Sequence, residues 1–173
     1  MEPRAAIDRV LLGALAGIVG TAAMTSAMRL LHRRLPPSER YPLPPREIME
    51  RLIPDAGRTA RSETGRQQAT LVAHFGYGAA AGALYAAAGG GRGPLAGAAY
   101  GVAVWGASYL GHLPALGILE PAVRHPLRRN ALMIAVHLVW GATMAASLRE
   151  LEAAETEIFS SGPSHDHPKQ RVA

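Results

Sequence analysis

A chain of 173 residues is the size of one domain, and this one carries 18 Lys and Arg against 13 Asp and Glu. It holds no Cys, which excludes disulfides and thiolate metal sites. The arginines flank apolar runs and do not alternate with aromatic residues, so basic loops beside membrane helices explain the charge better than nucleic-acid binding does. We therefore expect no nucleic-acid partner.

Four long runs of the chain contain no charged residue, and they predict the fold class. They cover residues 10–28, 69–91, 93–119 and 130–148, with lengths of 19, 23, 27 and 19 residues. At about 1.5 Å per helical residue, even the shortest reaches roughly 28 Å, close to the roughly 30 Å of a bilayer's hydrocarbon core. We predict an all-α, polytopic membrane protein with a bundle of four transmembrane helices.

Two alternatives stay open. The mean hydropathy of +0.07 is low for a membrane protein, which favours a soluble all-helical protein, although soluble helices carry a charged stripe that these runs lack. The first run is also compatible with a cleaved signal peptide, and cleavage would leave three spans. Glu2 and Asp8 before the run, together with its length, favour a retained span.

The connector at 29–68 contains nine arginines and one segment with a helical pattern. In YPLPPREIMERLIP, Pro44 and Pro45 fit the first turn of a helix and Pro54 ends it. The apolar residues of this segment share one face. We predict a short amphipathic helix in the first loop, which lies on the membrane surface, caps the bundle or remains a solvated connector.

The predicted membrane domain covers residues 1–151, and a tail follows at 152–173. The sequence GGGRGP between the second and third runs is a tight hairpin, so these runs are antiparallel neighbours. The tail begins as an amphipathic helix and ends in a segment of disordered composition. In that segment His165 and His167 offer a weak metal site, with a solvated chain end as the plainer interpretation.

The distribution of Lys and Arg predicts the orientation in the membrane. The loops on one side hold twelve of these residues, whereas the two termini and the hairpin hold six. Because positive loops stay on the cytoplasmic side, we expect cytoplasmic basic loops and external termini.

Small residues recur at the spacing that lets membrane helices approach closely, because backbone contact supplies much of helix association in lipid. All four runs carry such a pattern, which predicts a tightly packed bundle with a homo-oligomer or another membrane protein as a possible partner. The candidate packing residues are Gly13, Gly17, Gly78, Gly82, Gly93, Gly97, Gly101 and Gly141, the last paired with Ala145.

Three histidines lie inside the predicted spans, at His74, His112 and His137. Counted along the helices from the basic-loop side, all three lie roughly 7 to 11 Å deep. An unpartnered polar side chain at that depth costs several kcal/mol, so we expect the imidazoles to face the bundle interior as one polar layer. Other polar side chains near this layer are Tyr77, Tyr109 and Thr25.

The leading interpretation of the layer is a set of interhelical hydrogen bonds that organise the bundle. A proton or ion path is the second, because ionisable residues inside a membrane are functional candidates. A bound metal or haem is the third, since three imidazoles resemble a zinc triad and two can ligate haem iron. We predict no cofactor and no enzyme: Ser108 and His112 share a helix face, but no glycine-flanked nucleophile motif accompanies them.

Several short motifs occur in order between residues 42 and 151. They are PLPPR (Pro42 to Arg46), the His74 to Tyr77 segment, LAGA (Leu95 to Ala98), LPALGI (Leu113 to Ile118) and HLVW (His137 to Trp140). In this order the chain resembles the YagU-type family of small bacterial inner-membrane proteins. The third run is longer here than in the family pattern, and the preceding hairpin is richer in glycine.

The resemblance implies an inner-membrane protein without a defined biochemical activity, and His137 is its most family-like buried histidine. It supplies no catalytic residues. We therefore expect a non-enzymatic structural, scaffold or subunit protein in the lipid bilayer, with a proton- or metal-linked transporter or channel as the alternative.

Overall fold

A computed structural model describes residues 3–52, 63–91, 93–160 and 162. Within these ranges every regular element is helical. Predicted features at Pro54, His165 and His167 lie outside the described residues. The elements, in chain order, are α1 (Pro3–His32), η1 (Pro37–Glu39), α2 (Pro44–Leu52), α3 (Glu63–Ala87), α4 (Pro94–Gly106), η3 (Ala107–His112), α5 (Leu113–Ala115), η4 (Ala122–Arg124) and α6 (Leu127–Glu157).

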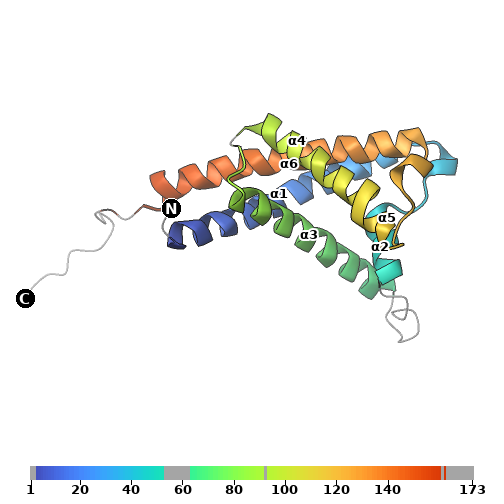
Figure 1. Cartoon of the computed structure of the whole chain (residues 1–173), viewed down its shortest axis with the longest axis horizontal. Helices are drawn as coiled ribbons and strands as arrows, with labels where there is room; N and C mark the ends of the chain where they lie inside the picture. Colours follow the sequence, from blue (N-terminus) through green and yellow to red (C-terminus); the bar gives the residue numbers. More distant parts are fainter. Residues whose placement is uncertain (1–2, 53–62, 92, 161, 163–173) are drawn as a thin grey trace, which may run out of the picture.

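The two longest helices, α1 and α6, form the central pair of the molecule. They pack against each other along its long axis, and α3 and α4 cross them diagonally (Figure 1). Helix α3 packs on α1, and α4 packs on α6. The described part of the chain is therefore arranged in the order α3, α1, α6, α4, with α3 and α4 meeting chiefly through side chains.

Length and composition allow two of the described helices to cross a membrane, over Ala6–His32 and Leu127–Glu157. Core helices of soluble proteins and signal sequences share these properties. Both helices extend past the uncharged runs, since α1 includes Arg29 and α6 continues through Glu152. Arg, Glu and Ala are good helix formers, so the end of an uncharged run marks a change of surroundings and not the end of a helix.

The third uncharged run is not one regular helix, in contrast to the single span expected over 93–119. Helix α4 passes at Gly106 into the wide turn η3, where the amide of Leu113 bonds the carbonyl of Ser108, five residues back. Pro114 explains the change, because it has no N–H and its ring clashes with the carbonyl of Leu110 in a regular helix. The helical chain ends at Ala115, and Gly117 follows with a φ of 68°.

The crossing of α1 and α3 is made of glycine. Gly13 and Gly17 of α1 face Gly82 and Gly78 of α3 so closely that an added Cβ at any of them overlaps the opposite backbone or side chain. A Cβ on Gly17, for example, overlaps the carbonyl oxygen of Gly78. These four residues therefore fix the distance between the two helices.

The crossing of α4 and α6 is built the same way, from Gly97 and Gly101 against Gly141. A Cβ on Gly141 overlaps the carbonyl oxygen of Gly97. Gly93, grouped with these residues from its spacing, has no atom within 4 Å of an added Cβ and only precedes α4, so its predicted packing role is wrong. Gly20 makes a further close approach, to Trp140 of α6, that no small-residue spacing revealed.

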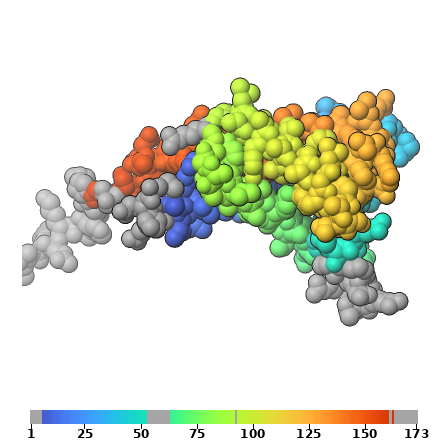
Figure 2. Space-filling model, in the orientation of Figure 1, coloured from blue at the N-terminus to red at the C-terminus, as the bar shows by residue number. Residues whose placement is uncertain are grey.

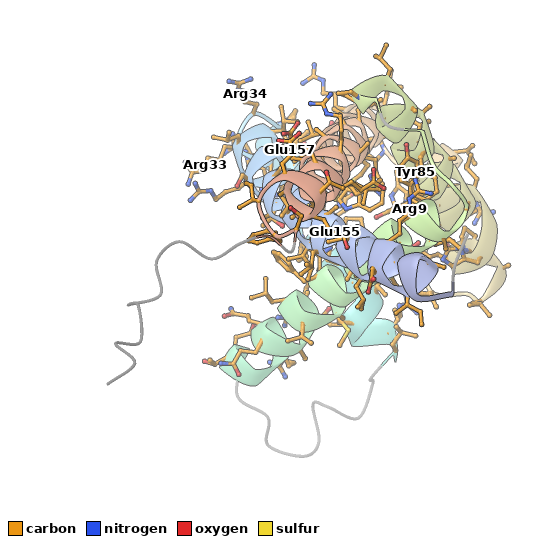
Figure 3. The ribbon with its side chains drawn as sticks, turned by 90° about the vertical axis from the view of Figure 1, so that its left-hand side faces the viewer. Arg9, Arg33, Arg34, Tyr85, Glu155 and Glu157 are labelled. Carbon is orange, nitrogen blue, oxygen red and sulfur yellow. The ribbon has the colours of Figure 1, made fainter. Side chains whose placement is uncertain are left out.

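The two ends of the molecule differ in charge. At the end that holds the N-terminus, Arg9 donates to Glu152 at 2.8 Å and lies beside Tyr85 (Figure 3). The opposite end, here called the basic end, comprises the C-terminus of α1, the connector with α2, the start of α3 and the segment from Glu120 to Arg129. Figure 2 shows that α2 lies beside α3 and the end of η3 at this basic end.

Candidate functional site

A cavity with a volume of about 280 Å³ lies at the basic end, between α3 and η3. Helices α1 and α6 form its floor, and α2 covers it from the connector side. Seven separate elements contribute to its wall, so only the folded chain creates it. Its lining is apolar except for a few hydroxyl, indole and imidazole groups.

Thr21 and Trp140, on the floor of the cavity, are hydrogen-bonded to each other. Trp140 Nε1 of α6 donates to Thr21 Oγ1 of α1 at 3.2 Å, and the same hydroxyl donates to the carbonyl of Gly17 at 2.8 Å. Both side chains are buried. Because their donors are satisfied within the protein, neither residue needs a ligand.

His137, on α6, forms one side of the cavity and is buried. Its Nδ1 lies 2.7 Å from the carbonyl oxygen of Met133 one turn earlier. A carbonyl only accepts, so Nδ1 carries the proton and Nε2 is left as an acceptor. The ring edge of His137 meets Tyr109 of η3 in a T-shaped contact with centroids 6.0 Å apart.

His74, on α3, lines the opposite wall and is half-buried. Its Nε2 is buried, yet no donor or acceptor of the described residues bonds it. Phe75 packs edge-on against the ring at 6.0 Å. Buried polar atoms in native proteins are nearly always partnered, so this nitrogen marks a place where a partner from outside the chain fits.

Two tyrosines bridge α3 to the helical segment opposite. Tyr77 and Ser108 share a hydrogen bond of 3.0 Å between their oxygens, and Tyr100 donates to the carbonyl of Ala81 at 2.9 Å. The wide turn η3 brings both Ser108 and Tyr109 into the interior, where both are buried. Tyr77 lines the cavity while 52% of its side chain is exposed, so the cavity reaches the molecular surface beside it.

Two predicted members of the polar layer lie elsewhere. His112 is exposed and does not line the cavity, so the expectation that all three histidines face inward is wrong for this residue. Thr25 donates to the carbonyl of Thr21 in its own helix at 2.8 Å and is also absent from the lining. Depth along a helix does not set the direction in which a side chain points, and η3 changes that direction for the residues after it.

The zinc-type triad considered for His74, His112 and His137 is therefore not assembled. Among the described residues no group of three or more His, Asp and Glu side chains is placed to hold a metal ion. Two imidazoles, His74 and His137, share the cavity with Tyr77 and Tyr109.

Four of the chain's six methionines line this one cavity, and the sequence offered no sign of this grouping. They come from three helices: Met24 and Met28 from α1, Met49 from α2 and Met133 from α6. Methionine is unbranched and polarisable, and it adapts to irregular apolar shapes. The lining is therefore suited to apolar groups of variable shape.

Arg129 holds in place the segment that leads into α2, the helix that covers the cavity. In the sequence it counts only as one of the basic loop residues. Its guanidinium is buried at the start of α6 and donates to the carbonyls of Glu39, Tyr41 and Pro42 at 3.0, 3.2 and 3.0 Å. It also stacks 3.5 Å from the centroid of the Tyr41 ring. A proline-rich segment has few N–H donors of its own to bond its carbonyls. This shortage is the one feature of the sequence that could have indicated a bond to a donor elsewhere in the chain.

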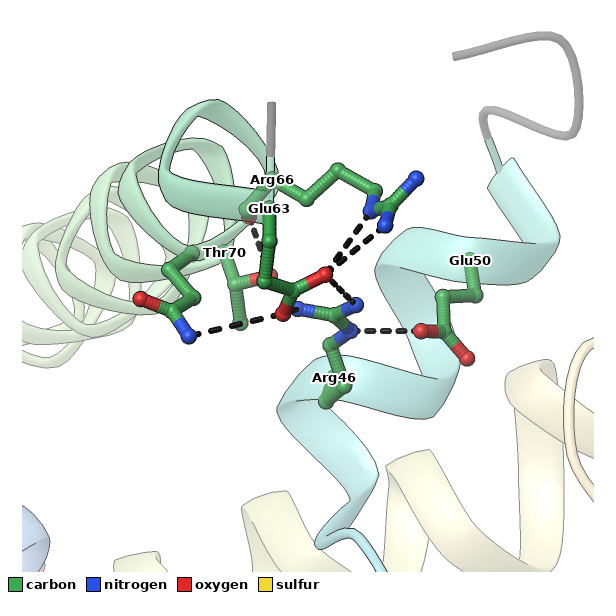
Figure 4. Close-up of polar contacts among 6 residues, drawn as sticks. Arg46, Glu50, Glu63, Arg66 and Thr70 are labelled. Atoms are coloured by element: carbon green, nitrogen blue, oxygen red, sulfur yellow. Dashed lines mark hydrogen bonds and ion pairs between the residues drawn. The ribbon is translucent and has the colours of Figure 1, made fainter. Parts of the chain in front are cut away.

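A second contact ties α2 to α3 (Figure 4). Arg46 donates to both oxygens of Glu63, at 2.8 and 3.1 Å, and also to Glu50, while Arg66 donates to Glu63 at 2.8 Å. Hydrogen bonds from Arg46 and then Arg66 lower the pKa of Glu63 to about 2, and the pKa of Arg46 is raised by Glu63 and Glu50. This ion cluster holds the predicted amphipathic helix with its apolar residues Ile48, Met49 and Leu52 over the cavity.

Comparison of the chain with family models, with curated proteins and with solved structures finds no match. The resemblance to the YagU-type family accordingly stays a prediction that rests on the quoted motifs.

Proposed function

We propose that this chain is a non-enzymatic integral membrane protein that crosses the bacterial inner membrane four times and serves as a structural subunit or scaffold. The four crossings are α1, α3, the α4–η3 segment and α6. The interior polar groups organise the bundle in this proposal, and the lipid bilayer is its first partner. A homo-oligomer or a larger membrane complex is the expected assembly.

The observation that carries the proposal is the reversed distribution of large and small residues on α1. Its exposed side carries Leu11, Leu15 and Ile18, which are 59%, 52% and 40% exposed. Its packed side carries Gly13 and Gly17, against α3. A helix on the surface of a soluble protein buries its large apolar side chains and exposes polar ones, whereas lipid favours the distribution seen here.

The other elements show the same distribution. Large apolar side chains are exposed on α3, α4 and η3 as well, at Val72, Leu84, Leu95 and Leu110. So many exposed large apolar side chains on the packed helices favour contact with a membrane or a partner. The arginines at the basic end favour a cytoplasmic position for the connector.

Membrane topology provides the test. Because the natural chain contains no Cys, each introduced cysteine is the single thiol that can be labelled. Single cysteines are introduced at Ser38 and Val123 on the basic end and at Gly93 and Ser160 on the other, and spheroplasts are treated with a membrane-impermeant maleimide. Four crossings predict labelling at Gly93→Cys and Ser160→Cys alone. Leu15→Cys, inside α1, is the unlabelled control before detergent is added.

Gly93 decides between the possible numbers of crossings. If only α1 and α6 crossed the membrane, the hairpin would lie on the same side as Ser38, and both positions would react alike. Recovery of the protein in the carbonate-soluble fraction, with the four loop positions all labelled or all protected before detergent is added, would overturn membrane insertion altogether.

A proton-linked transporter is the second candidate, favoured by the two imidazoles of His74 and His137 in one cavity. A structural role tolerates His137→Gln, because an amide still donates to the Met133 carbonyl. Loss of proton flux in liposomes with unchanged thermal stability would favour transport over the structural role. An absorption spectrum of the purified protein tests haem at the same time, since a Soret band lost in the His74→Gln variant would mark an iron ligand.

A further inference from the structure

We propose that the cavity between α3 and η3 binds a neutral, single-chain lipid alcohol, with the hydroxyl between His74 and His137 and the chain among the methionines. The proposal rests on the membrane placement above, because the ligand enters from the bilayer. It adds a binding site and a class of ligand to a protein that is otherwise proposed to be structural.

The unpaired polar atoms identify the head group. Thr21, Trp140, Ser108 and Tyr77 already satisfy one another or the backbone. Three groups remain. No donor in the described structure reaches Nε2 of His137, which only accepts, and Nε2 of His74 is buried without a partner. The hydroxyl of Tyr109, which also lines the cavity, has no hydrogen-bond partner among the described residues and can either donate or accept. The two nitrogens, which are more restricted, therefore set the chemistry of whatever occupies the cavity.

A hydroxyl matches the bonding capacity of both imidazoles, which line the same cavity. It donates its proton to His137 Nε2 and accepts from His74 in the tautomer that carries the proton on Nε2. A ketone or ester carbonyl only accepts, so it leaves the His137 nitrogen unpaired. The pair of rings thus favours an alcohol over a carbonyl head.

The absence of charge in the lining requires a neutral ligand. None of the described Lys, Arg, Asp or Glu side chains lines the cavity. Arg129, which holds the segment before α2, already donates to three backbone carbonyls and stacks on the Tyr41 ring. A carboxylate or phosphate head would be removed from water without a counter-charge, which costs far more than a hydroxyl does.

The walls suit an alkyl chain. Met24, Met28, Met49 and Met133 surround the space together with Ile48 and Leu113. The volume of about 280 Å³ lies just below the roughly 300–1,000 Å³ range of small-molecule sites, so the cavity holds only the head and first part of a chain. The remainder leaves beside the half-exposed Tyr77, where the proposed membrane placement puts lipid.

The test is photolabelling of the full-length protein in phosphatidylcholine vesicles, with three probes that carry the same diazirine chain. They are a C16 alcohol, the C16 carboxylic acid and the C16 alkane. At subsaturating concentration we expect the alcohol to label peptides that contain Met24, Met28 or Met133. The acid and the alkane should label those peptides several-fold less.

The matched variants are His74→Leu and His112→Leu, which make the same change inside and outside the cavity. Loss of one hydrogen bond should lower labelling by the alcohol about fivefold in His74→Leu and leave the alkane unaffected. His112→Leu should label as the native protein does. Met49→Trp, which fills the cavity from the exposed cover helix, should reduce labelling by both probes and serves if His74→Leu does not fold.

Equal labelling by alcohol and alkane, or labelling that neither His74→Leu nor Met49→Trp changes, would overturn the proposal and leave a water molecule as the partner of the imidazoles. The cysteine topology is measured independently. If the labelling results contradict alcohol binding while the topology still shows four crossings, the proposed ligand is refuted and the membrane placement is not.

Discussion

Thr21 of α1 and Trp140 of α6 are joined across the core, with Trp140 Nε1 donating to Thr21 Oγ1 at 3.2 Å. The same hydroxyl donates to Gly17, and a Cβ on Gly78 of α3 overlaps it. One threonine thus connects three helices below the cavity.

Thr21→Val keeps the shape of the side chain and removes both hydrogen bonds. It leaves the buried indole N–H without an acceptor, and we expect a loss of about 1–3 kcal/mol in the free energy of unfolding. Thr21→Ser retains the hydroxyl and serves as the control. Thermal unfolding in detergent, followed by tryptophan fluorescence, measures both, and equal melting temperatures for the two variants would contradict the bond.

Gly141→Ala places a methyl group against the backbone of Gly97, where no flexible side chain can move aside. Overpacking of this kind costs about 1–3 kcal/mol, so the melting temperature should fall by several degrees. Gly93→Ala makes the same change in open space and should leave it unchanged. A stable Gly141→Ala protein would show that α4 and α6 lie further apart than described.

Arg129→Gln removes the clamp from three backbone carbonyls of the connector, and a shorter amide cannot reach them all. We expect a loss of about 2–4 kcal/mol and faster proteolysis of the α2 segment. Arg128→Gln changes the neighbouring exposed residue and tests charge alone. If both variants are cleaved at the native rate, Arg129 does not hold the cover.

The ion cluster between α2 and α3 should make attachment of the cover depend on pH only in strong acid. Arg46 and Arg66 lower the pKa of Glu63 from 4.5 to about 2, so its stabilising effect is complete above pH 4.5 and is lost as the pH falls through 2. Glu63→Gln removes this dependence. Proteolysis of α2 by pepsin between pH 2 and 5 measures it, and identical pH profiles for the two proteins would contradict the assignment.

Much of the helical layout could be predicted from residue patterns, because helix formation and apolar content are local properties. The uncharged runs indicated α1, α3 and α6, and the prolines at 44 and 45 indicated the start of α2. Pro114 has no N–H and interrupts the hydrogen bonds of a regular helix near Leu110, but the wide turn that results is not visible in the sequence. A missing N–H is visible in a sequence, whereas the way a chain accommodates it depends on its surroundings.

The sequence by itself determined how deep each histidine lies along its helix, since helix rise is constant, and where small residues allow two backbones to meet. Only the tertiary structure decided which way each side chain points. Rotation about a helix axis is set by packing against neighbours, so His74 and His137 share a cavity while His112 lies outside it. The grouping of four methionines and the reach of Arg129 to the connector join residues far apart in the chain, which no local pattern specifies.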